Sequence, residues 1–259
     1  MNNQSLNGMP DKKLRELPTN YPRSICAYCG ASDNLTKDHI PPEQLFPSPR
    51  PSNLITVPTC GNCHSDTSKD DEYFRLKMCL REDVGNHPKA RKDWDAIFRS
   101  LNRTEASGFR KSFFADIRSV PLSTPAGIFI GQRLGYDVDM IRIRRVVERI
   151  TRGFYFVERG SPLGLHNEVR VHADEDLQQE TKETLNDLNK NILFPLAAQT
   201  PKVIGDNVFS YRFHILDENP VYSVWNLNFF GSVPFLCFSG PGTNLTTKPS
   251  SPPQVLTTR

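Results

Sequence analysis

Two pairs of cysteines with the same internal spacing are the residues of this chain best suited to chemistry. Cys26 and Cys29 form a first C-x2-C pair, and Cys60 and Cys63 form a second, with thirty residues between the pairs. Each C-x2-C turn can offer two thiolates to one ion, and two such turns complete the tetrahedron that zinc prefers in structural sites. We therefore expect the four cysteines to hold one structural Zn²⁺, whose binding would contribute to folding because this segment has little core of its own.

A second set of polar residues is interleaved with the cysteines. Asp38 and His39 stand side by side between the two pairs, Asn53 follows them, and His64 comes directly after the last cysteine. Histidine is suited to proton transfer, and carboxylate and imidazole groups are suited to binding a metal ion, so these residues could form a second site with its own chemistry. Neighbouring residues of a strand point to opposite sides, so Asp38 and His39 can serve different partners.

The order of these residues resembles the HNH nuclease family in its four-cysteine ββα-metal form. The matching segments are CAYC, KDHIPP, NLITV and CGNCH leading into a helix, and together they cover roughly residues 24–75. The resemblance implies that Asp38 and His64 bind a catalytic metal, that His39 is the general base, and that Asn53 orients the base or the loop around it. It also implies Mg²⁺ or another divalent ion as catalytic cofactor, and products with a 5′-phosphate and a 3′-hydroxyl.

One departure from the family pattern keeps a second function open. Some members carry a further histidine four residues after the position of His64, where this chain has Ser68. The catalytic metal would then have only two protein ligands, and a zinc-stapled nucleic-acid-binding or regulatory module without catalysis is the alternative. Lys69 lies near a lysine common in the family and is either a phosphate contact or a solvated helix residue. Asp70 and Asp71 are expected to be solvated.

A row of arginines forms a second candidate interface. Four arginines recur at spacings of three and four residues in a helix predicted over residues 139–156, so they share one face; they are Arg142, Arg145, Arg149 and Arg152. Guanidinium groups match phosphate oxygens, so this face could follow a nucleic-acid backbone. The equally weighted reading is a solvated basic face that pairs with the acidic helix predicted over residues 174–190.

Composition limits the class of protein. The chain has 259 residues, 37% of them hydrophobic and 24% charged, with a formal net charge of +3. This is sufficient for a real core and one or two domains, whereas the small net charge identifies no partner. No apolar run is long enough to span a membrane, and the polar N-terminus lacks the apolar segment of a secretory signal, so we expect a cytoplasmic protein with reduced thiols.

The elements that must position these residues predict an α+β protein. We expect a flexible leader over residues 1–21, a nuclease domain over 22–82, an α+β domain over 83–239 and a disordered tail over 240–259. The further predicted elements are a short strand in NLITVP, a helix from Cys63, helices over KARKDWDAIFRSL, SGFRKSFFADIRSV and residues 174–192, a strand in AGIFIGQRLG, and a meander of NVFSYRFHIL, YSVWNLNFF and VPFLCFS.

These expectations combine into one functional hypothesis. The chain is expected to hydrolyse phosphodiester bonds in nucleic acid, with double-stranded DNA as the expected substrate and no membrane partner. A homodimer would allow two single-strand cuts to make a double-strand break. The region 83–239 resembles no family and is a candidate specificity or sensor domain, with the nuclease as its effector.

Overall fold

The computed structural model describes residues 17–65, 67–102, 107–108, 110–111, 117–124, 126–177 and 182–242. Most of the predicted leader and most of the predicted tail, residues 1–16 and 243–259, lie outside the described residues.

The segment that contains the four cysteines, residues 22–82, is called the cysteine segment. It folds as a hairpin followed by helices. Strand β1 (Thr36–Ile40) pairs antiparallel with β2 (Ile55–Thr59), which confirms the strand predicted in NLITVP. Between the strands lies a single helical turn, η1 (Glu43–Leu45). The helix predicted from Cys63 is two helices, α1 (Gly61–His64) and α2 (Thr67–Cys79), because Ser65 adopts an extended conformation with φ −60° and ψ 142°.

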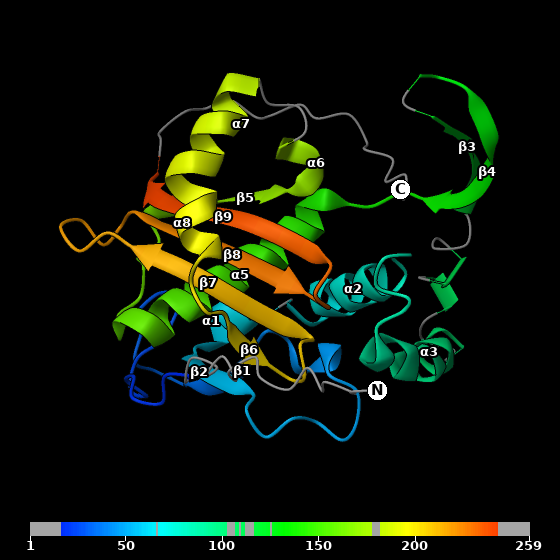
Figure 1. Ribbon diagram of the computed structural model, residues 1–259. Coiled ribbons are helices and arrows are strands. Elements are labelled where there is room, and N and C mark those ends of the chain that lie inside the picture. The colour runs from blue at the N-terminus through cyan, green and yellow to red at the C-terminus, as the bar shows by residue number, and fades with distance from the viewer. Residues whose placement is uncertain are drawn as a thin grey trace, which may run out of the picture.

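A helix and a projecting hairpin follow. Helix α3 (Pro88–Leu101) matches the helix predicted over KARKDWDAIFRSL, and strand β4 (Phe129–Tyr136) matches AGIFIGQRLG. The helix predicted over residues 107–120 is wrong in its last part, because Ile117 begins strand β3 (Ile117–Ser123), which pairs with β4. The hairpin stands apart from the body of the protein (Figure 1).

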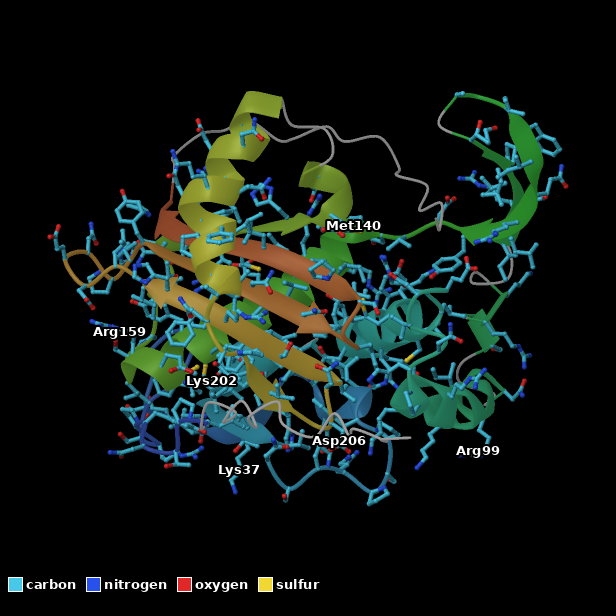
Figure 2. All side chains as sticks on the ribbon, in the orientation of Figure 1. Lys37, Arg99, Met140, Arg159, Lys202 and Asp206 are labelled. Atoms are coloured by element: carbon cyan, nitrogen blue, oxygen red, sulfur yellow. The ribbon has the colours of Figure 1, made fainter. Side chains whose placement is uncertain are left out.

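Helix α5 (Met140–Arg159) is the central helix, and its ends are fixed by its own sequence. Asp139 caps the first turn by accepting hydrogen bonds from the amides of Ile141 and Arg142, and Gly160 ends the helix with φ 74°, a conformation that favours glycine. Met140 and Arg159, labelled in Figure 2, mark the two ends of this helix, which crosses one face of the large sheet. The helix predicted over residues 139–156 is therefore confirmed.

The large sheet is antiparallel, with strand order β5-β9-β8-β7-β6. The predicted meander is confirmed as β7 (Phe209–Ile215), β8 (Ser223–Phe229) and β9 (Val233–Pro241). The two outer strands, β5 (Asn167–Ala173) and β6 (Lys202–Ile204), were not predicted from the sequence. Apolar residues of β5, β7, β8 and β9 face α5, and residues from the helix and the strands stack there, with the Phe154 and Tyr211 ring centroids 4.2 Å apart.

A second layer of short helices covers part of the opposite face of this sheet. These helices are α6 (Asp174–Leu177), α7 (Lys182–Leu188), the π-helical turn η3 (Asn189–Leu193) and α8 (Phe194–Ala197). In Figure 1, α7 and α8 lie in front of the sheet and α5 behind it. Where it is described, the helix predicted over residues 174–192 is confirmed as α6 and α7, but from Asn189 it widens into the π-helical turn, and it continues past residue 192 into α8.

The cysteine segment and the large sheet share one core, and the predicted α+β class is confirmed. Buried apolar residues from the cysteine segment and from the sheet belong to one cluster, for example Val57, Phe74, Phe154 and Trp225. Phe74 of α2 packs edge-on against Phe229 of β8 with centroids 5.1 Å apart. The predicted boundary between residues 82 and 83 therefore does not separate two cores. Over the described part of the chain, none of the helices has the length and apolar character needed to cross a membrane.

Candidate metal centre and the polar residues around it

The four predicted cysteines come together. The Sγ atoms of Cys26, Cys29, Cys60 and Cys63 all lie within 4.8 Å of one another, and those of Cys29 and Cys60 are 3.6 Å apart. A tetrahedron with Zn–S bonds of about 2.3 Å places its sulfurs roughly 3.8 Å apart, so the arrangement fits zinc. Among the described residues this is the one group of at least three His, Cys, Asp or Glu side chains close enough to hold an ion together. The four cysteines could therefore bind a metal such as zinc.

The thiols of this cluster differ in acidity. Burial would raise the pKa of Cys26, but hydrogen bonds from the backbone at Cys60, Cys29 and Tyr28 outweigh it and lower that pKa to about 7. Burial raises the pKa of Cys29 and of Cys63. Thiolates are the form that binds a metal, so a bound cation would stabilise the deprotonated forms of Cys29 and Cys63 against the effect of burial.

Strand β1 presents its two chemically distinct residues on opposite faces. Asp38 and Ile40 are buried, whereas Lys37 is exposed and His39 is half-buried. Figure 2 shows Lys37 pointing away from the rest of the protein. The inner face of β1 therefore carries Asp38, and the outer face carries His39, as the alternation of a strand predicts. The cross-strand neighbours are Val57 for Asp38 and Thr56 for His39.

Asp38 is held by side chains from two distant parts of the chain. Tyr28, which lies between the first two cysteines, donates a 2.6 Å hydrogen bond from its hydroxyl to Asp38 Oδ2. Arg149 of α5 places its Nε 3.7 Å from the same oxygen and donates a hydrogen bond from Nη2 to Asp71 of α2. Burial, and then the Asp38 carboxylate, raise the pKa of Tyr28 well above its ordinary value, so this hydroxyl stays a donor. The inner face is thus a buried polar network.

His39 has a partner that the sequence did not suggest. Its Nδ1 lies 3.7 Å from Oε2 of Glu43 in η1, and Arg50 forms an ion pair with the same oxygen at 3.0 Å. A carboxylate facing Nδ1 favours the tautomer with its proton on that atom, which leaves Nε2 as the basic nitrogen. The spacing of four residues between His39 and Glu43 was visible in the sequence, but the intervening Ile40–Pro41–Pro42 gave no reason to expect a turn that brings them together.

The remaining two predicted site residues have different surroundings. Asn53 donates from Nδ2 to the Val203 carbonyl at 3.1 Å and accepts from the Gly205 amide at 3.3 Å, so it ties the loop before β2 to the end of β6. Both of these contacts are with β6 and the residue that follows it, and neither is with His39. His64 ends α1 with its side chain exposed, and it follows Cys63 in the same turn. Binding of a metal at the cysteines would therefore also fix the position of His64.

The four arginines of the row form ion pairs with carboxylates of the same chain. Arg142 and Arg145 both pair with Asp70, at 2.6 and 3.1 Å, and Arg149 pairs with Asp71. The expectation that Asp70 and Asp71 are solvated is therefore wrong for these two carboxylates, which have little exposure because α5 packs on α2.

Arg152, the last arginine of the row, and Lys69 of α2 also make hydrogen bonds within the chain. Arg152 pairs with Glu148 and donates to the carbonyls of Gly164 and Asn167. Lys69 has an exposed side chain, and its carbonyl accepts from Arg142. Arg145, with 64% of its side chain exposed, keeps far more surface than Arg142, Arg149 or Arg152. Where the acidic segment is described, its contact with α5 comes from Arg144, which is outside the row and donates to Asp176.

A large cavity lies far from these residues, on the opposite face of the sheet. It has a volume of about 900 Å³ and lies between the outer face of β7, β8 and β9 and the helices η3 and α8; its lining includes Arg170, Leu196, His214, Val224 and Phe238. The sheet and α5 separate it from β1. Comparison of the chain with protein-family models, with curated proteins and with solved structures finds no match.

Proposed function

We propose that this protein is a metal-dependent endonuclease of the HNH type that hydrolyses phosphodiester bonds in nucleic acid, with double-stranded DNA as substrate. The observation that carries the proposal is the division of β1 into two faces: a histidine whose Nδ1 faces the Glu43 carboxylate lies on the outer face, and a carboxylate lies next to it on the inner face. The hairpin that holds both is followed directly by the cysteine turn that carries His64.

The roles follow from these positions. His39 takes a proton from water through Nε2, because Glu43 favours the proton on Nδ1. Asp38 and His64 would hold Mg²⁺ or another divalent ion, which supplies charge neutralisation at the phosphate and stabilises the leaving oxygen. Tyr28 occupies one carboxylate oxygen of Asp38, and no described residue is hydrogen-bonded to Oδ1, which is the oxygen offered to the ion. The four cysteines hold the structural zinc.

The test is cleavage of a supercoiled plasmid by the zinc-loaded protein in Mg²⁺ or Mn²⁺. We expect nicked product that disappears with EDTA and in His39→Ala. The matched control is His214→Ala, which changes an exposed histidine at the far cavity and should cut like the native protein. An intact plasmid in every lane, or equal cutting by His39→Ala, would overturn the proposal.

The second candidate is a zinc-stapled nucleic-acid-binding or regulatory module without catalysis. It is favoured by the near-complete burial of Asp38 and by Ser68 at the position where a third ligand could stand. Binding of duplex DNA with undiminished affinity by His39→Ala, together with an absence of cutting in the native protein, would select this function. We also propose a cytoplasmic location and a homodimer, in which two single-strand cuts would make a double-strand break.

A further inference from the structure

We infer that Arg149 is a positioning residue for the catalytic metal ligand, so that helix α5 of the C-terminal region is an integral part of the nuclease centre. The inference rests on the proposed function, because it concerns how Asp38 is presented to the divalent ion. It goes beyond the HNH resemblance, which ends near residue 75 and includes no residue of α5.

The first observation is where Arg149 lies. Its side chain is 11% exposed and reaches past α2 to the inner face of β1, where the side chain of Asp38 is 7% exposed. Burial alone would lower the pKa of Arg149, but the carboxylates of Asp38 and Asp71 outweigh it and the net shift is upward. A guanidinium placed at this depth must be paired, and its partners are the candidate metal ligand and one carboxylate of α2.

The second observation is how α5 comes close enough for this contact. Gly153 lies one helical turn after Arg149 and faces Ile40 of β1; a Cβ at Gly153 would meet Ile40 Cγ2 at 2.8 Å. Glycine in the middle of a helix costs roughly 0.5–1 kcal/mol relative to alanine. Here the missing side chain lets the helix approach the strand, and Arg149, on the same face of α5, is delivered to Asp38.

The third observation is the division of the Asp38 carboxylate. Both contacts, from the Tyr28 hydroxyl and from Arg149, converge on Oδ2. Among the described residues the hydrogen bond to the Asp38 carboxylate goes to Oδ2 and none goes to Oδ1, and Arg149 Nε, which is buried and 3.7 Å from Oδ2, has no hydrogen-bond partner. A small movement of Asp38 would close this last contact. The hydrogen bond from Tyr28 and the positive charge of Arg149 act on the same oxygen, so they orient the carboxylate and leave the other oxygen for an ion, as partners of ligating carboxylates do in metal sites.

The fourth observation is the charge of the network. Asp38 and Asp71 contribute two negative charges and Arg149 one positive charge, so the three groups together retain one negative charge. Asp71 therefore compensates Arg149, and Asp38 can still attract a cation. If Asp71 were missing, Arg149 would neutralise the metal ligand instead of orienting it.

The sign of one affinity change tests this inference. The zinc-loaded protein, with one zinc per chain, is titrated with Mn²⁺ in a calorimeter, and Asp38→Asn identifies the site that depends on Asp38. If Arg149 positions Asp38, Arg149→Ala weakens Mn²⁺ binding by about 10- to 100-fold, the range for partners of ligating groups. If Arg149 only opposes a cation, its removal tightens binding. Arg145→Ala, which removes an exposed arginine of the same row, is the matched control and should leave the affinity unchanged.

Two further variants separate positioning from loss of the fold. Arg149→Lys keeps the charge but cannot bridge two carboxylates with a planar fork, so it should restore the melting temperature without restoring Mn²⁺ affinity. Tyr28→Phe keeps the ring and removes only the hydroxyl, and it should also weaken Mn²⁺ binding. Tighter or unchanged binding in Arg149→Ala and Tyr28→Phe would overturn the inference alone. A native protein without an Asp38-dependent Mn²⁺ site would overturn the proposed function and this inference together.

Discussion

The cysteine segment and the large sheet are held together by different forces. The sheet packs aromatic rings: Phe154 of α5 stacks on Phe209 at 5.3 Å, and Phe213 stacks on Trp225 at 4.8 Å. The hairpin β1–β2 and its helices instead surround a cluster of four thiols and a buried network of Asp38, Tyr28 and Arg149 with α2. We therefore expect the sheet to be stable on burial alone, and the cysteine segment to need a bound cation and these polar contacts in addition to the shared core.

Removal of the metal should have the largest effect on the difference in stability between the two regions. Structural zinc contributes about 10–16 kcal/mol of apparent binding free energy in small domains, so chelation should unfold the hairpin, α1 and α2. Hydrogen exchange of the zinc-loaded and chelated protein should show that amides of β1, β2 and α2 lose protection while those of β7, β8 and β9 keep most of theirs. Equal loss of protection in β8 would contradict the difference between the regions.

Truncation in the aromatic stack should have the next largest effect. Phe209 is fully buried against Phe154, Tyr211 and Phe229, and Phe209→Ala should lower the free energy of unfolding by about 3–5 kcal/mol. The measurement is urea unfolding followed by circular dichroism, with and without zinc. Because the lost contacts are apolar, the decrease should be similar in both conditions, and a decrease seen only in zinc-loaded protein would count against the account.

The contact between the two regions should be sensitive to one methyl group. Gly153→Ala places a Cβ 2.8 Å from Ile40 Cγ2, and overpacking of this kind costs about 1–3 kcal/mol. Thermal unfolding should show the loss, and Gly153→Ala should cost less in an Ile40→Ala background than in the native protein, because the clashing atoms are gone. A Gly153→Ala protein as stable as the native one would show that α5 and β1 are not in close contact.

Asn53 offers the most local change. It ties the loop before β2 to β6 through two hydrogen bonds, and Asn53→Ala should cost about 0.5–1.5 kcal/mol for each. If Asn53 orients this loop and does not contact His39, the variant should lose stability with only a small decrease in cleavage rate. A decrease in cleavage rate as large as that of His39→Ala, with an unchanged melting temperature, would show that Asn53 acts in catalysis and not only in stability.

Patterns local in sequence predicted much of this fold, and contacts distant in sequence were missed. The meander, α5 and the cysteine cluster follow from alternation, helical spacing and the C-x2-C repeat, each readable within a few residues. The strands β5 and β6 were missed, and β6 is only three residues long and is recognised by its pairing with β7.

The same distinction between local patterns and distant contacts explains which residues of the candidate site could be predicted from the sequence. The four cysteines and the adjacent pair Asp38 and His39 could be predicted as site residues from their type and spacing. Arg149 could not be joined to Asp38 from the sequence, because 111 positions separate them and the contact depends on the glycine that lets α5 approach β1. Glu43 was hidden for a different reason, since its position near His39 depends on the turn that η1 makes.

The most direct test of the central claim is the rate of plasmid nicking at increasing Mn²⁺ concentration for the native protein, His39→Ala and Asp38→Asn. The base on the outer face of β1 and the metal ligand on its inner face should fail in different ways. We predict that His39→Ala lowers the maximal rate at least about 100-fold, as expected for a general base, without moving the Mn²⁺ concentration at half-maximal rate. Asp38→Asn should move that concentration upward. Native cutting that neither variant changes would contradict the assignment of this centre as a nuclease site.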